Sequence, residues 1–393
     1  MNRQISKGQA VLFIVTCWAT AFAVMWQMPE MVIVNDLYFV FPEQSGIITA
    51  MLSWPSLLTA LSSLLAGSLL QKLSTKTELI IGGAAMLVMI FAPTSNNIYL
   101  VFVCSLIAAF GAGFSNTAGM AVLSEVLIDE NLRSRHMGFY NAVMSLIGAV
   151  ISYLAGVLAL SSWQSIFQIY WFAIPMLIMT FLFIPDIKPG DRLQNADGSA
   201  SDQTAPGARE GFGGRFWIFF FSMFLFFMAY VPLSSYLSVY ISENNLGSTA
   251  FAGTCTSLAT VGSCVSCLFF GFIYAKTKRK ISILVLALDI ILFLWAMLSP
   301  TPISALIASI GSGASYGAIF SLCYAYSAEI VPFSRIGMAM GLMTFNYAIG
   351  ISVGVYVTQW LMGIFGSLTK TLLLTVIFCS ISLIIEIISS IQK

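Results

Sequence analysis

The chain has 393 residues, of which 59% are hydrophobic and 8% are charged, and its formal net charge is +1. A soluble domain carries roughly 25% charged residues, so this composition excludes an ordinary water-soluble fold and favours a protein embedded in lipid. The near-zero net charge and the absence of a basic stripe in the sequence give no support for a nucleic-acid partner.

About twelve apolar segments are long enough to cross a bilayer as helices of about 20 residues. They lie near 10–33, 44–70, 78–93, 98–123, 137–160 and 164–185 in the first half, and near 213–241, 250–274, 281–298, 302–326, 337–362 and 369–391 in the second. These runs are much longer than the roughly 10-residue alternating strands of a membrane barrel. The sequence therefore predicts an all-α membrane protein with about 12 transmembrane helices.

The first apolar run follows Arg3 and Lys7, as the apolar region of a signal peptide follows its basic residues. The run continues past residues 19–21 to about Val34. We therefore expect it to be an uncleaved first span.

Residues 186–215 form the only long polar stretch and lie near the middle of the chain. They hold nine of the 33 charged residues, with Gly, Pro, Ser and Ala between them. Such a segment buries too little apolar surface to offset its ordering entropy. We therefore predict an N-terminal six-helix bundle over 1–185, a flexible cytoplasmic linker over 186–212 and a C-terminal six-helix bundle over 213–393.

The basic residues predict the orientation of the spans. With twelve spans, sixteen of the 17 Lys and Arg residues fall on the side of both termini, and only Lys370 falls on the other. Cytoplasmic loops carry an excess of Lys and Arg. We therefore expect a multi-pass protein of the plasma or inner membrane with both termini in the cytoplasm.

An internal repeat is visible at a separation of 204 residues. Gly67 and Gly271 each leave a predicted span and are followed by basic residues, and Glu125 and Glu329 each end a later span. Near the same separation, the pair Tyr140-Asn141 is matched by residues 345–346. Two pseudo-symmetric six-helix bundles are thus predicted, an arrangement found in secondary transporters.

The two loop-motif copies make the chain resemble the major facilitator superfamily over nearly its whole length. The family motif reads Gly, three residues, Asp, a basic residue, any residue, Gly, Arg and a basic residue. The matching positions are Gly67, Lys72 and Lys76 in the first copy and Gly271, Lys276, Arg279 and Lys280 in the second. The resemblance implies that these residues belong to a cytoplasmic gate, but Gln71 and Ala275 replace its Asp, so the gate is weaker or differently built here.

The resemblance also implies a solute pathway between the halves, lined by the first, fourth, seventh and tenth spans and flanked by the second, fifth, eighth and eleventh. The candidate substrate-binding residues are Trp26, Gln27, Glu30, Trp54, Asn116, Tyr230, Ser312, Tyr316, Asn346 and Tyr347. Glu30 shares a helix face with Trp26, and it lies either in the pathway or at the outer interface. For each other residue, an interhelical hydrogen bond or packing is the alternative.

Asp289 is the deepest ionisable residue of the predicted spans. A carboxylate without a cation in hydrocarbon should be largely protonated, so Asp289 and Glu30 are candidate proton-coupling residues. The ninth span is peripheral in the family, so a structural role with a hydroxyl partner is the alternative for Asp289.

The predicted solute is a small neutral or cationic, lipophilic organic molecule, because no Lys or Arg falls in the middle of a span to replace the water of an anion. The predicted function is secondary transport by alternating access, with proton coupling left open and an antiporter and a symporter equally allowed. The alternatives are a non-transporting receptor or scaffold with the same fold, and a carrier for an organic anion such as a monocarboxylate.

We expect no enzyme activity, because the single histidine, His136, lies at a predicted helix start beside the membrane. We also expect no metal and no cofactor, because the pair Cys264 and Cys267 has no second pair to complete a site. The expected partners are a small-molecule solute, the lipid bilayer and, if transport is coupled, protons, and the expected state is a monomer.

Overall fold

The computed structural model describes residues 7–69, 73–126, 130–186, 212–331 and 336–391, and within these ranges every regular element is a helix. The first half contains α1 (Lys7–Ala19), α2 (Ala21–Val24), α3 (Met28–Val32), α4 (Val34–Val40), η1 (Pro42–Gln44), α5 (Ser45–Leu69), α6 (Thr75–Leu87), η2 (Val88–Thr94), α7 (Ile98–Val126), α8 (Glu130–Ala159), η3 (Trp163–Phe172) and α9 (Ala173–Phe183). The second half contains α11 (Gly214–Ser235), α12 (Leu237–Glu243), α13 (Thr249–Thr277), α14 (Lys280–Leu298), α15 (Pro302–Ile330), α16 (Ile336–Phe365) and α17 (Leu368–Ile391).

Eleven helical segments of the described chain are long and apolar enough to span a membrane, and a shorter apolar helix, Val15–Val24, accompanies them. This agrees with the predicted all-α class and with about twelve spans. The difference lies in the first span, which is broken into the four short helices α1 to α4. Pro29 lies at the start of α3 and cannot donate a backbone hydrogen bond, which favours a break there. The Thr16 and Thr20 hydroxyls donate to the carbonyls of Leu12 and Cys17, and such side-chain bonds compete with the regular helical ones.

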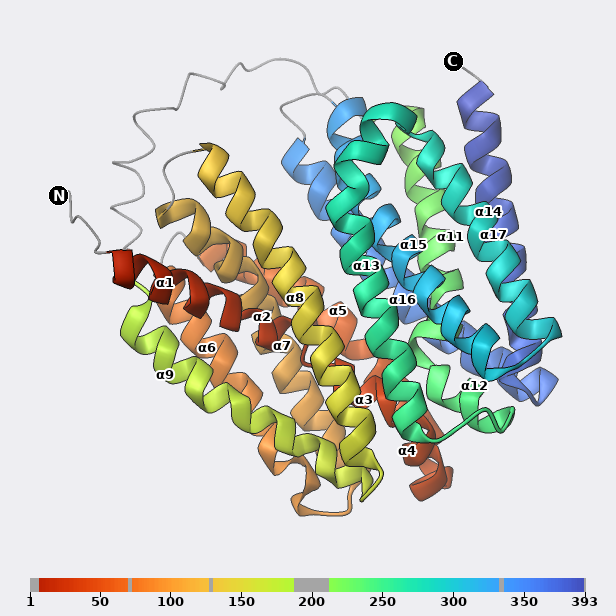
Figure 1. Cartoon of the computed structure of the whole chain (residues 1–393), viewed down its shortest axis with the longest axis horizontal. Coiled ribbons are helices and arrows are strands. Elements are labelled where there is room, and N and C mark those ends of the chain that lie inside the picture. Colours follow the sequence, from red (N-terminus) through yellow and green to blue (C-terminus); the bar gives the residue numbers. More distant parts are fainter. Residues whose placement is uncertain (1–6, 70–72, 127–129, 187–211, 332–335, 392–393) are drawn as a thin grey trace.

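The helices form two bundles that lie side by side (Figure 1). In the first bundle α7 packs on α5 and α6, and in the second α15 packs on α13 while α17 packs on α14 and α11. We call the end at which α9 finishes and α11 begins the linker side, and the opposite end, where α5 begins, the distal side (Figure 1). The predicted linker lies almost wholly outside the described residues, so the domain boundaries remain predictions.

Glycines at matching places let helices approach closely within each bundle. On α7, a Cβ atom at Gly113 would lie 2.6 Å from the carbonyl oxygen of Thr59 on α5. On α15, a Cβ at Gly313 would overlap the carbonyl oxygen of Ala259 on α13. Each pair joins the second and fourth long helices of its bundle at a separation of 200 residues, so both halves use the same backbone contact.

Candidate functional site

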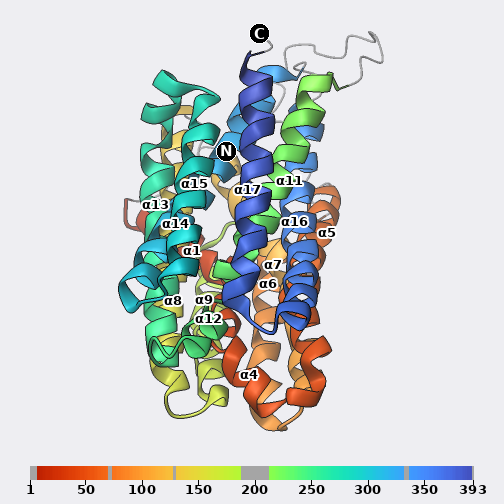
Figure 2. The ribbon, with the colours of Figure 1, turned by 90° about the vertical axis from the view of Figure 1, so that its right-hand side faces the viewer.

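The two bundles meet mainly through two helix pairs, α8 with α13 and α5 with α16. Figure 2 shows α16 and α5 side by side along their distal portions. The Ser352 hydroxyl on α16 donates to the Ser53 carbonyl at 2.9 Å, and the Trp54 indole on α5 donates to the Tyr356 hydroxyl at 2.6 Å. Thr49 donates to the side-chain carbonyl of Gln359 one turn nearer the distal end.

A second group of distal contacts joins α4 to α12 and α13. The backbone N–H of Asn35 donates to Ser238 at 3.2 Å, and the Thr249 hydroxyl donates to the Asp36 carboxylate at 3.1 Å. The Cys264 thiol contacts the Ala142 carbonyl at 3.7 Å, near the middle of both α13 and α8. Among the described residues, every hydrogen bond between the bundles therefore lies in the distal half or at the midpoint.

The backbones of α8 and α13 come into direct contact at Gly156 and Gly253. A Cβ added at Gly156 would lie 2.9 Å from the Cα of Gly253, and one added at Gly253 would lie 2.7 Å from the Ser152 carbonyl oxygen. A side chain on either glycine would push the two helices apart. We call the contacts between the bundles in their distal half the distal seam. This seam therefore depends on the absence of side chains at these two positions.

Three predicted site residues come together as an aromatic cluster in the second bundle. The rings of Tyr230 on α11 and Tyr316 on α15 stack with centroids 5.0 Å apart, and Tyr347 on α16 lies 5.9 Å from Tyr316. Phe320 and Phe227 pack against Tyr347 at 5.7 and 5.3 Å. The three tyrosines are only half-buried, so three different helices present aromatic and hydroxyl groups at one place.

Two predicted residues near this cluster have structural partners. The Asn346 amide donates to the Phe220 carbonyl at 2.7 Å, although its own side-chain oxygen is buried without a partner. The Ser312 hydroxyl donates to the Ser309 carbonyl in its own helix at 3.1 Å. Both side chains are almost fully buried, which favours packing over solute contact for Ser312.

Asp289 lies inside the second bundle on α14 and is 1% exposed. Its Oδ1 atom has no hydrogen-bond partner. Ser315 on α15 faces it, but the serine hydroxyl lies outside hydrogen-bond geometry and also lacks a partner. Ser315 directly precedes Tyr316, so the carboxyl lies behind the helix turn that carries the aromatic cluster.

Glu30 is buried in the first bundle and is 2% exposed, so its side chain lies among the helices and not on the protein surface. The Ser105 hydroxyl on α7 donates to Glu30 Oε1 at 2.5 Å, and Oε2 has no partner. The neighbouring turn is held by Tyr170, whose hydroxyl donates to the Trp26 carbonyl at 2.6 Å. Ser105 could not be predicted as the partner of Glu30, because one serine in an apolar helix has no distinguishing pattern.

The remaining predicted pathway residues of the first bundle are spread apart. Gln27 donates to the Met51 carbonyl at 3.1 Å, which ties the first span to α5. Trp54 is 54% exposed and lies across the seam between the bundles. Asn116 on α7 is half-buried, and its side chain makes no hydrogen bond among the described residues. These residues do not form one compact cluster with Glu30.

Comparison with known proteins identifies the family. Residues 10–355 match the Major Facilitator Superfamily. The chain belongs to this superfamily of membrane transporters. A search of curated proteins found no match.

Solved structures of transporters share the superfamily fold with this chain. The nucleoside transporter NupG superposes with a TM-score of 0.75 at 14% identity, over 96% of this chain and 99% of that one. A bacterial homologue of the human lysosomal transporter Spinster, in an inward-facing and unoccupied conformation, superposes with a TM-score of 0.74 at 14% identity, over 98% of this chain and 97% of that one. The peptide transporter POT in complex with sulfate superposes with a TM-score of 0.74 at 13% identity, over 98% of this chain and 93% of that one. Family and fold thus point to a transporter rather than an enzyme.

The superfamily loop motif makes contacts within the second bundle. Arg279 forms a two-pronged ion pair with Glu386 on α17, with Nε and Nη2 at 2.8 and 2.9 Å from the carboxylate oxygens. Its Nη1 also donates to Ser389 at 2.7 Å and to the Tyr326 hydroxyl at 3.2 Å. Burial alone would lower the pKa of Arg279, but Glu386 outweighs burial and raises this pKa, so the guanidinium stays charged.

The other motif residues make weaker contacts or none. The Lys76 ammonium lies 5.1 Å from the Phe181 ring centroid, and the Lys276 ammonium lies 4.4 Å from that of Phe272. A Cβ atom at Gly271 would meet nothing within 4 Å. Lys280 is exposed, the surroundings of Gly67 are not described, and Lys72 lies outside the described residues. The predicted gate role of these seven residues remains a prediction.

Proposed function

We propose that the protein is a secondary transporter that moves a small neutral or cationic organic solute by alternating access between its two bundles. The observation that carries this proposal is the one-sided seam: the described hydrogen bonds between the bundles lie in the distal half or at the midpoint. A pair of bundles held together at one end is suited to rocking about a site between them. The arrangement corresponds to a state closed on the distal side.

The tyrosine cluster supports the proposed solute class. Tyr230, Tyr316 and Tyr347 are half-buried and present ring faces from three helices, and aromatic faces attract cations and apolar groups. The described lysines and arginines lie at helix ends or in loops, so none is placed to replace the lost water of an anion in the middle of a span. An organic anion is therefore the less favoured solute.

Coupling to protons is proposed through the two buried carboxyl groups. Glu30 and Asp289 are each at most 2% exposed, and each has one carboxyl oxygen without a partner among the described residues. No described Lys or Arg forms an ion pair with either. A carboxyl group in this setting can take up and release a proton when its exposure changes.

The test is solute flux into liposomes that contain the purified protein. A panel of nucleosides, organic cations and neutral metabolites is offered with and without an inward or outward proton gradient. We expect uptake of at least one neutral or cationic solute, and a change of its rate with the gradient. Absence of flux across the whole panel, with the protein shown to be folded, contradicts the proposal and favours a receptor or scaffold.

A further inference from the structure

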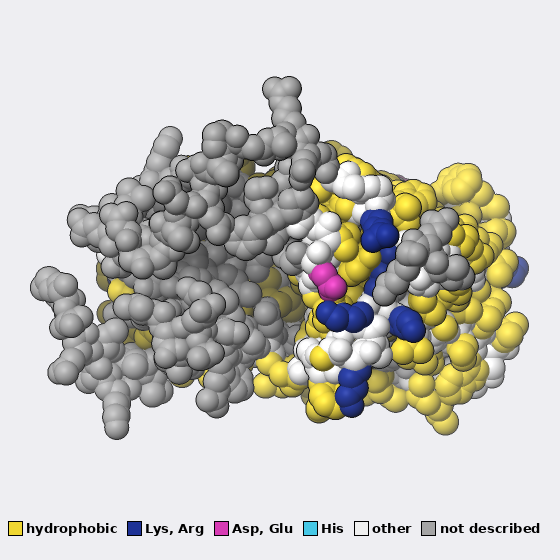
Figure 3. Space-filling model, turned by 90° about the horizontal axis from the view of Figure 1, so that it is seen from above, with side chains coloured by type: hydrophobic (Ala, Val, Ile, Leu, Met, Phe, Trp, Pro, Cys, Tyr) yellow, Lys and Arg dark blue, Asp and Glu magenta, His cyan; other side chains and the backbone are white. Residues whose placement is uncertain are grey.

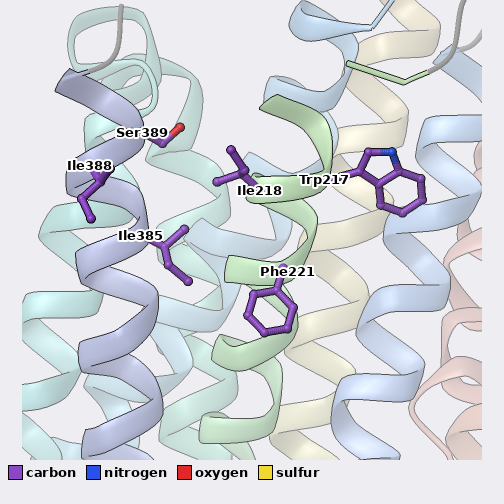
Figure 4. A pocket seen from close by; sticks show the side chains of 6 residues that line it. All are labelled: Trp217, Ile218, Phe221, Ile385, Ile388 and Ser389. Carbon is purple, nitrogen blue, oxygen red and sulfur yellow. The ribbon is translucent and has the colours of Figure 1, made fainter. Parts of the chain in front are cut away.

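An apolar groove of about 440 Å³ lies between α11 and α17 on the outer face of the second bundle. Figure 4 shows its walls. They are formed by Trp217, Ile218 and Phe221 from α11 and by Ile385, Ile388 and Ser389 from α17. The groove is separate from the tyrosine cluster and from the seam between the bundles.

The groove lies near the linker side, where a lipid headgroup would be. Trp217 is the fourth residue of α11 and Ser389 is the third residue from the end of α17, so one lies in the first turn and the other in the last turn of its helix, both on the linker side. Phe221 and Ile385 lie one turn deeper. Tryptophan is enriched at the membrane–water boundary, and Trp217 is 49% exposed there. The groove therefore runs from the interface into the hydrocarbon layer.

An exposed cation, Arg215, lies in the first turn of α11, next to the residues that line the groove. Arg215 is exposed and precedes Ile218 by three residues, which places the two on neighbouring parts of the helix face. No ion pair or hydrogen bond of the Arg215 side chain occurs among the described residues. By contrast, Arg279 is neutralised by Glu386. Figure 3, seen from the linker side, shows that Lys and Arg side chains predominate over acidic ones on the described part of this face.

A second polar group is available beside the mouth. The Ser389 hydroxyl accepts a hydrogen bond from Arg279 Nη1 at 2.7 Å. A hydroxyl has one O–H donor besides its acceptor positions, so the Ser389 O–H remains free to donate. A hydroxyl donor, together with a guanidinium that has no partner among the described residues, lies beside an apolar groove, and this combination matches the phosphate and the upper acyl chain of one lipid.

We propose that this groove binds an anionic glycerophospholipid of the linker-side leaflet, with one acyl chain between α11 and α17 and its phosphate at Arg215. The charge at the mouth selects the anionic lipid, because one Lys or Arg at a membrane surface contributes about 1 kcal/mol toward anionic lipid, or roughly fivefold in affinity. The apolar walls hold the chain and do not depend on the headgroup.

Native mass spectrometry of the full-length protein tests the proposal. Dioleoyl-phosphatidylglycerol or dioleoyl-phosphatidylcholine is added to the protein in detergent, and the retained lipid is counted. We expect about fivefold preference for the anionic lipid in the wild type, and a ratio near one in Arg215→Gln. Lys370→Gln removes an exposed cation in the first turn of α17, at the distal end, and should keep the wild-type ratio.

A groove-filling variant tests the acyl-chain part separately. Ile385→Trp, with Ile388→Phe as the second choice if the first is not monodisperse, should reduce retention of both lipids several-fold. An undiminished preference for phosphatidylglycerol in Arg215→Gln overturns the assignment of the headgroup. Unchanged lipid retention in the filled variants overturns the assignment of the chain. Neither result depends on whether the protein transports a solute.

Discussion

At the scale of single residues, the pair Arg279–Glu386 is the most strongly held polar contact of the described chain. Glu386 is fully buried and accepts from Arg279 and from Ser282 at 2.9 Å or less. Removal of one partner of a buried ion pair leaves an uncompensated charge, which costs about 3–5 kcal/mol. The exposed pair Lys278–Glu329, at 3.6 Å, should contribute at most about 1 kcal/mol.

We therefore expect Glu386→Gln to lower the apparent melting temperature in detergent by several degrees, and Glu329→Gln to change it little. The double change Arg279→Met with Glu386→Leu should recover much of the loss, because no charge is then left buried. Thermal unfolding followed by intrinsic fluorescence measures all three. Equal melting temperatures for Glu386→Gln and Glu329→Gln would contradict the ranking.

The buried carboxyl groups give a second prediction at this scale. Asp289→Asn or Glu30→Gln keeps the shape of the side chain and removes its titratable proton. The solute flux in a proton gradient should therefore fall to the flux measured without a gradient, while solute binding stays measurable. Glu43→Gln, an exposed carboxyl near the distal end, is the matched control. Full gradient stimulation in both buried-site variants would reject the coupling assignment.

At the residue scale, the sequence singles out a residue that is unusual in its own span. Asp289 and Glu30 stand out because ionisable residues in apolar runs are rare, and both are buried in the structure, while their coupling role stays a prediction. Glu386 was not selected, because its partner Arg279 lies 107 residues earlier and no local pattern connects them. Which tyrosines stack on one another is likewise decided by the packing of α11, α15 and α16.

At the scale of elements, the long helices were predictable because a bilayer requires about 20 apolar residues per span. The breaks in the first span were not predictable, because each break depends on a local competition for backbone hydrogen bonds. Pro29 and the threonines at 16 and 20 were visible in the sequence. Their combined effect on the helix depends on neighbouring helices, which can form hydrogen bonds with the backbone N–H and C=O groups that the breaks leave unpaired.

The contact between α8 and α13 gives a prediction at this scale. Gly253→Ala places a methyl group 2.7 Å from a backbone oxygen and should force the distal seam open. Ser238→Cys, buried at 4% exposure beside the seam, then reports the opening through its rate of reaction with a membrane-impermeant thiol reagent. We expect at least a severalfold faster reaction with Gly253→Ala.

The control for this substitution is Gly363→Ala, because a Cβ atom there meets nothing within 4 Å and the residue lies in α16. It should leave the labelling rate of the same cysteine unchanged. Identical rates in the two alanine variants would show that close packing of α8 on α13 does not hold the seam.

At the scale of the whole molecule, the repeat in the sequence anticipated two bundles, and matching glycine contacts occur in both. The conformation could not be anticipated, because the same sequence must be compatible with every state that a transporter visits. Which side is closed depends on small differences in free energy between states. Under the proposed alternating access, the distal hydrogen bonds, such as Asn35 with Ser238, should break when the distal side opens.

A crosslink across the distal seam tests whether the bundles must separate there. The backbone nitrogen of Asn35 lies 3.2 Å from the Ser238 hydroxyl, so the double variant Asn35→Cys and Ser238→Cys should form a disulfide on mild oxidation. Because alternating access requires this seam to open, we expect oxidation to abolish solute flux and a reductant to restore it. Asn35→Cys alone, oxidised in parallel, should transport normally. Undiminished flux through the fully crosslinked protein would mean that the distal contacts are permanent and that rocking of the bundles is not the mechanism.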